Sequence, residues 1–178
     1  RLRFIPDMMY LLLLAMKRGI IHLYKIDILF LDREFEHDVY ELIKAFYPEA
    51  EIHTLYDEAE AGEYDLRFRV ERENETYKIS YDRRENVTAG FTERKGVASA
   101  EVIGEDKLTV KDPHALRKEN KDVLKYALYQ LLVKLTGRTL PWGNLTGIRP
   151  AKLAMGMIES GMKNTEAAQE MRDKYLVS

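Results

Sequence analysis

The side chains best suited to chemistry gather in one short stretch, PWGNLTGIRP, at residues 141–150. It holds the only tryptophan of the chain, Trp142, with two glycines and two prolines. Glycine adopts positive φ angles easily and lets a backbone or ligand approach closely. Gly147, Arg149 and Lys152 lead into a predicted helix start, where free N–H groups and two cations would suit a carboxylate or phosphate. We therefore predict a candidate anion or substrate site at Gly147, Arg149 and Lys152.

A rigid joint explains the same stretch without any ligand, and on the residues alone we favour it. In this interpretation Pro141 and Pro150 stiffen the ends, Gly143 turns the chain, and Trp142 fills a core. Arg149 would then clamp a nearby carboxylate instead of a ligand. The glycine spacing matches neither a P-loop nor a dinucleotide-binding fingerprint. Both interpretations therefore stay open.

The sequence predicts no catalytic residue and no metal site in this chain. It has no cysteine, which excludes disulfides, thiolate catalysis and clusters ligated by cysteine. The four histidines have no short ligand spacing, and the serines lie outside any nucleophile-elbow context. We accordingly predict that the chain by itself holds no cofactor and is inactive as an enzyme.

The opening half predicts a β-α-β unit followed by an antiparallel hairpin. Residues 20–31 are typical of a strand, Asp32 should cap a helix with one apolar stripe, and residues 51–56 favour a second strand. Alternating apolar and charged residues on both sides of Asn74 predict the hairpin. Residues 83–112 are less distinct: 86–93 and 107–110 are possible strands, with turns expected at the three glycines Gly90, Gly96 and Gly104.

Helices should dominate the second half. Asp112 and Pro113 form a helix start and Gly137 a helix end, which predicts a long amphipathic helix between them. Two shorter helices should follow, over 151–160 and from the Asn164 cap to the end of the chain. The predicted fold class is α+β: a small mixed or antiparallel sheet packed on a long helix, with a helical tail.

Charge and hydropathy restrict the partners. The net charge is −2, so no global basic field attracts nucleic acid or an acidic membrane. One face of the long helix is basic and could be solvated or could bind RNA or a nucleotide; it consists of Arg117, Lys118, Lys121 and Lys125. The apolar run at residues 8–16 is too short to span a bilayer, which needs about 20 residues, and lacks a signal-peptide cleavage site. We predict a cytoplasmic protein with no nucleic-acid or membrane partner.

The string LPWGNLTGIRPAKLA, residues 140–154, resembles coproporphyrinogen dehydrogenases of the HemZ type. These are oxygen-independent coproporphyrinogen III oxidase-like members of the radical S-adenosylmethionine proteins. Similar proteins carry Leu-Pro-Trp-Gly-x-Leu-Thr-Gly-x-Arg-Pro-x-Lys, and Ala151 stands where many have Thr. Residues 37–52 and 115–143 also resemble the family, so the likeness runs over about 20–178 and leaves 1–19 as an extension.

The resemblance implies oxidative decarboxylation of coproporphyrinogen III to protoporphyrinogen IX in haem biosynthesis. It also implies a [4Fe–4S] cluster, held by a Cys-x-x-x-Cys-x-x-Cys motif, and S-adenosylmethionine. Since this chain has no cysteine, it would be an accessory α+β domain, 20–137, followed by a connector and helical linker, 138–178. Its expected partner is the catalytic domain of the same parent chain, with a porphyrinogen substrate as a second candidate. The alternative is a free-standing RNA- or nucleotide-binding module.

Overall fold

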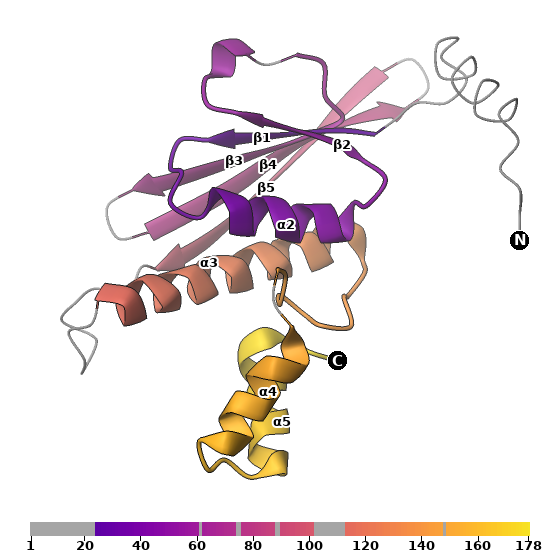
Figure 1. Ribbon diagram of the computed structural model, residues 1–178. Helices are drawn as coiled ribbons and strands as arrows, with labels where there is room; N and C mark the ends of the chain where they lie inside the picture. The colour runs from indigo at the N-terminus through magenta and orange to yellow at the C-terminus, as the bar shows by residue number, and fades with distance from the viewer. Residues whose placement is uncertain (1–23, 61, 74–75, 88–89, 102–112, 148) are drawn as a thin grey trace, which may run out of the picture.

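A computed structural model describes residues 24–60, 62–73, 76–87, 90–101, 113–147 and 149–178 (Figure 1). A five-stranded mixed sheet has the order β2-β1-β3-β4-β5. Its strands are β1 (Lys25–Phe30), β2 (Glu51–Leu55), β3 (Leu66–Glu73), β4 (Thr76–Val87) and β5 (Gly90–Glu101). The helices α2 and α3 lie on one side of the sheet, and a helical hairpin extends away from them (Figure 1). The predicted α+β class is confirmed.

The β-α-β opening is confirmed, with helix α2 (Glu36–Phe46) between two parallel strands. β1 lies between β2 and β3 and pairs in parallel with both, so Ile26 faces Ile52 on one side and Leu66 on the other. Asp32 does not cap the helix as predicted. Its Oδ1 accepts a hydrogen bond from the Glu34 amide at 2.8 Å, which shapes the loop before the helix begins.

The predicted hairpin is β3 and β4, and β5 continues the antiparallel meander. The sequence prediction was wrong in two details here. Residues 86–93 do not form one strand, because β4 ends at Val87 and β5 begins at Gly90. Gly96 lies within β5, paired with Tyr81, because a single glycine does not interrupt a ladder that continues on both sides. The predicted turn at Gly104 and strand at 107–110 lie outside the described residues.

Helix α3 (Pro113–Thr136) is the predicted long helix, and its end at Gly137 has the expected positive φ of 69°. It packs with α2 against the sheet. The main core contains side chains from both helices and from three strands, among them Leu128, Phe46 and Phe68. The rings of Phe46 and Tyr129 meet edge to face with centroids 5.4 Å apart, which joins α2 to α3.

The tail consists of α4 (Pro150–Glu159) and α5 (Asn164–Tyr175). Lys163, not Asn164, is the N-cap, and its amide donates to Glu166 Oε2 at 3.0 Å. The last helix also has an end that the sequence did not predict, since Leu176 adopts a left-handed φ of 59°. Among the described residues, none of the helices combines the length and the apolar character needed to cross a membrane. The extension at 1–19 lies outside the described residues.

Candidate functional site

The connector between α3 and α4 packs against the end of α5. The amide of Asn144 donates to the Tyr175 carbonyl at 2.9 Å. Gly143, at a φ of 56°, lies so close that an added Cβ would overlap the backbone of Tyr175 and Leu176. The close approach predicted for this glycine is therefore present, and its partner is the chain itself. Leu145 completes the contact in a small second core that includes Met171 and Tyr175.

Charged side chains, one of them buried, connect the connector and α5 to α3. Lys125 Nζ donates to Thr146 Oγ1 at 3.0 Å and lies 3.9 Å from an Asp38 oxygen. Burial lowers the pKa of Lys125, and the nearby Asp38 carboxylate opposes that shift. Lys174 of α5 lies 3.3 Å from a Glu119 oxygen and makes a second ion pair with Asp122 of α3. The tail is thus held in place by directional contacts as well as by apolar packing.

Trp142 does not fill a core, and this part of the joint interpretation was wrong. Its residue surface is 55 % exposed. The Gly143 amide donates to the Leu140 carbonyl at 3.0 Å, and the Leu145 amide to the Trp142 carbonyl at 3.1 Å. These bonds close a tight turn that places Trp142 at its outer corner and Leu145 inside. Pro141 is exposed beside it, and Pro150 occupies the first helical position as predicted.

The Arg149 side chain makes no hydrogen bond or ion pair with any residue that the structure describes. The predicted clamp on a local carboxylate is therefore not observed. Arg149 occupies the N-cap position of α4, and Lys152 lies in the first turn, both exposed. Gly147 has a φ of 72° with open space around it, so it serves the turn and not a close approach.

Arg149 and Lys152 line a hollow of about 570 Å³ between α3, α4 and α5, whereas Gly147 does not. We call this the tail hollow. Its charged lining also includes Lys118, Lys174 and Glu170, and its apolar lining consists of Leu153, Gly156, Met157, Met162 and Tyr175. The structure thus brings together two of the three predicted site residues. Sequence reasoning missed Lys174, because only the folding of α5 onto α3 brings it beside the other cations.

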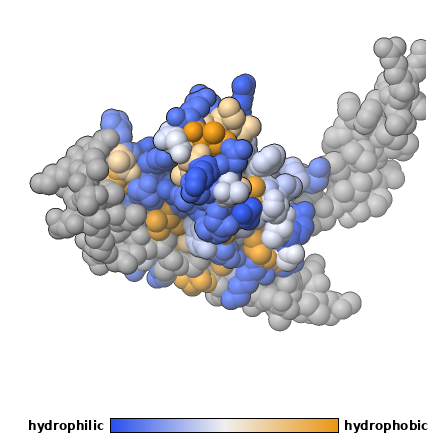
Figure 2. All heavy atoms as spheres, turned by 90° about the horizontal axis from the view of Figure 1, so that it is seen from below, coloured by the Kyte–Doolittle hydropathy of each residue, from blue (hydrophilic) through white to orange (hydrophobic). Residues whose placement is uncertain are grey.

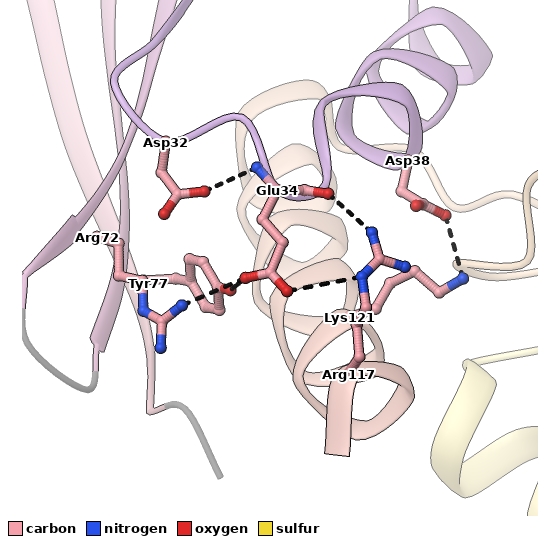
Figure 3. A network of polar contacts seen from close by, with 7 residues as sticks. All are labelled: Asp32, Glu34, Asp38, Arg72, Tyr77, Arg117 and Lys121. Carbon is pink, nitrogen blue, oxygen red and sulfur yellow. Dashed lines mark hydrogen bonds and ion pairs between the residues drawn. The ribbon is translucent and has the colours of Figure 1, made fainter. Parts of the chain in front are cut away.

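The basic face of α3 is partly solvated, since Arg117 and Lys118 are exposed and Lys121 is half-buried, but three of its four cations also contact polar groups of the fold. Arg117 donates to the Glu34 carbonyl at 3.2 Å, and Lys121 lies 3.7 Å from an Asp38 oxygen (Figure 3). Lys125 is buried, as described above. Of the four predicted cations, Lys118 remains available, and it lines the tail hollow.

The described residues include no group of three or more His, Asp or Glu side chains that could hold a metal ion. A [4Fe–4S] cluster with thiolate ligands does not fit this chain, because the sequence contains no cysteine. What the tail can do chemically is bind and orient a molecule at its cationic hollow.

Comparison with known proteins supports the resemblance found in the sequence. No family model matches the chain. Over 60 residues, 34 % of this chain, it is 42 % identical to the "Oxygen-independent coproporphyrinogen-III oxidase-like protein HemZ" of Bacillus subtilis (strain 168). The match spans 12 % of that protein's length. The resemblance to coproporphyrinogen oxidase-like proteins of the HemZ type is therefore confirmed over this part of the chain.

Proposed function

We propose that this chain is an accessory region of an oxygen-independent coproporphyrinogen III oxidase-like radical S-adenosylmethionine protein. The observation that carries the proposal is the 42 % identity with the HemZ protein over 60 residues. In such a protein a separate catalytic domain would convert coproporphyrinogen III to protoporphyrinogen IX during haem biosynthesis in the cytoplasm. The accessory region would hold that domain and help to present the substrate.

The surface of the tail supports a role in holding another domain. Helix α4 has no buried residue, although six of its ten positions are apolar. Met155 and Ile158, one turn apart on α4, are 53 % and 37 % exposed, and Trp142 of the connector is exposed as well. Figure 2 views the molecule from the side of this hairpin and shows apolar residues among hydrophilic ones. Exposed large apolar side chains gathered on one element are typical of an interaction surface.

The division of chemistry follows from the residues. The catalytic domain would supply the cysteines for a [4Fe–4S] cluster that, with S-adenosylmethionine, provides the radical chemistry. This chain has no cysteine to bind the cluster. Its contribution would be mechanical and electrostatic: a fixed connector at Gly143 and Asn144, and cations at Arg149 and Lys152 that face an anionic molecule. A porphyrinogen carries several propionates and is one candidate for that molecule.

The test is made on the complete protein that the reading frame of this chain encodes. We expect a cysteine triad downstream of Ser178, and anaerobic reconstitution of the complete protein should give the absorption of a [4Fe–4S] cluster. The 178-residue chain should give only background iron and sulfide. Conversion of coproporphyrinogen III, followed by chromatography, should require both parts. A complete protein without the triad, or one that cleaves S-adenosylmethionine but leaves coproporphyrinogen III unchanged, would refute the proposal.

A further inference from the structure

The tail hollow concentrates positive charge in a chain that is slightly acidic. Its lining contains four cations, Lys118, Arg149, Lys152 and Lys174, and one carboxylate, Glu170, whereas the whole chain has a net charge of −2. Carboxylates are abundant elsewhere, with 30 Asp and Glu residues in total. The excess of cations is therefore local to this hollow, and a cleft of one charge sign attracts ligands of the opposite sign.

Most of these cations are not neutralised by the fold. Lys174 pairs with Glu119 and Asp122 of α3. Lys118, Arg149 and Lys152 make no side-chain hydrogen bond or ion pair within the described ranges. Three cations thus line one hollow without a direct ion pair among the described residues, although Lys118 is close enough to the Asp122 carboxylate to interact with it electrostatically. A bound anion could pair with them directly, and the planar guanidinium of Arg149 can bind a carboxylate with two parallel hydrogen bonds.

Apart from Ser160, the remaining lining of the hollow is largely apolar. Leu153 and Met157 of α4 lie one turn apart, and Met162 and Tyr175 complete the lining from the next turn and α5. Methionine adapts to ligands of irregular shape because its side chain is flexible and polarisable. Gly156 keeps one side open, since an added Cβ there would meet no atom within 4 Å. The volume of about 570 Å³ is within the usual range of pockets for small organic molecules.

We propose that the tail hollow is a binding site for an organic anion with an apolar body. Arg149 and Lys152 bind its carboxylate, Lys118 adds to the attraction, and Leu153, Met157 and Met162 cover the apolar part. An inorganic anion would satisfy the cations but leave the apolar lining in contact with water. A nucleic acid would need a continuous basic surface, but on the neighbouring face of α3 the other cations already contact Glu34 or Asp38. The proposal does not depend on the catalytic role suggested above.

Isothermal titration of the 178-residue chain with decanoate below its micelle concentration tests the site. We expect saturable binding to one site that weakens as salt is added, because the attraction is partly between charges. 1-Decanol lacks the carboxylate, and a hydrogen bond to a charged group contributes about 1.5–3 kcal/mol, so 1-decanol should bind at least about tenfold more weakly. Inorganic phosphate keeps the charge but has no apolar chain to cover Leu153 and Met157, so it should also bind more weakly. Equal binding of 1-decanol, or of phosphate, would overturn the proposal, as would the absence of decanoate binding.

Variants locate the binding. Arg149→Gln and Lys152→Gln should each weaken decanoate binding about tenfold. Lys134→Gln, which removes an exposed charge from α3 outside the hollow, should leave it unchanged. Gly156→Phe places a ring at the open side of the hollow and should abolish binding without loss of charge, whereas Gly156→Ala should not. Circular dichroism melts confirm that each variant is folded. The site would be refuted if Lys134→Gln weakened decanoate binding as much as Arg149→Gln and Lys152→Gln do. It would also be refuted if Gly156→Phe, Arg149→Gln and Lys152→Gln all kept full binding.

Discussion

A single carboxylate, that of Glu34, joins the loop before α2 to the sheet and to α3 (Figure 3). Its Oε2 accepts a hydrogen bond from the Tyr77 hydroxyl at 2.9 Å and one from Arg72 at 3.2 Å. The guanidinium of Arg117 lies 3.7 Å from the other carboxylate oxygen. Tyr77 is 1 % exposed, and its ring packs edge to face with Phe35 at 5.9 Å. The substitution Tyr77→Phe removes only the hydroxyl and keeps this packing.

We expect Tyr77→Phe to lower the free energy of unfolding by about 1–2 kcal/mol. A hydrogen bond to a charged acceptor contributes about 1.5–3 kcal/mol. The lower part of that range applies, because the Glu34 side chain is 32 % exposed and keeps Arg72 and Arg117 as partners. For a chain of this size each kcal/mol corresponds to about 2–4 °C in Tm.

Urea unfolding at neutral pH, followed by far-ultraviolet circular dichroism, measures the effect. Tyr126→Phe is the matched control, since Tyr126 is 41 % exposed and should tolerate loss of its hydroxyl. A double-mutant cycle with Glu34→Gln should give a coupling energy of about 1 kcal/mol between the two side chains. If Tyr77→Phe costs no more than Tyr126→Phe, or if the cycle shows no coupling, the assigned role of this contact is wrong.

The same contact predicts a dependence on alkaline pH. Burial and the hydrogen bond to Glu34 raise the pKa of Tyr77 above its ordinary value of 10.0. The folded chain therefore keeps the phenol proton at pH values where the unfolded chain has lost it. This contribution to stability is complete below pH 10 and is lost as the pH rises toward the folded-state pKa. The stability difference between the natural chain and Tyr77→Phe should accordingly shrink above pH 10.

The remaining predictions concern the connector and the tail. In thermal melts, Gly143→Ala should lower the stability several times more than Gly147→Ala, because a Cβ at Gly143 would overlap the backbone. At Gly147 only the φ of 72° opposes a side chain, which costs about 1–2 kcal/mol. Equal losses of stability would contradict this. Trp142→Ala should cost less than about 2 kcal/mol in urea unfolding, because a buried ring would cost about 3–5 kcal/mol and this one is 55 % exposed. Burial lowers the pKa of Lys125, so the folded chain binds fewer protons than the unfolded chain, and its stability should rise as the pH approaches the ordinary lysine value of 10.5. Lys125→Met should abolish this rise, and a pH profile of stability parallel to that of the unsubstituted chain would refute the prediction. Arg149→Lys should leave Tm unchanged but weaken decanoate binding, because lysine keeps the charge and loses the planar geometry. A lowered Tm would indicate that Arg149 holds a carboxylate of the fold after all.

Local patterns were enough to predict the main elements. Period-two alternation on both sides of Asn74 predicted β3 and β4, and the apolar stripe ending at Phe46 predicted α2. The long helix α3 begins at Pro113, a residue suited to the first helical position, and is followed by Gly137, whose positive φ ends it. These features depend on backbone preferences within a few positions, which is why the sequence alone reveals them.

The candidate site depended on contacts that are distant in sequence, and here prediction was less successful. Trp142 was expected inside because large aromatic rings are usually buried, but the tight turn gives the inner place to Leu145. The basic stripe of α3 is partly solvated as its pattern indicated, but its contacts with Glu34 and Asp38, which are distant in the sequence, were not predicted. Lys174 joined the tail hollow only through the packing of α5, 55 residues after its partner Glu119.

The connector separates two tasks that the sequence places in one stretch. Its first half, at Gly143, Asn144 and Leu145, holds α5 through backbone contact, a hydrogen bond and apolar packing. Its second half delivers Arg149 to the tail hollow without a carboxylate partner among the described residues. If the fold needed Arg149 as a clamp, one of the many carboxylates would lie within reach of it. A rigid first half keeps the unpaired cation in position, and an anion is the partner that would complete it.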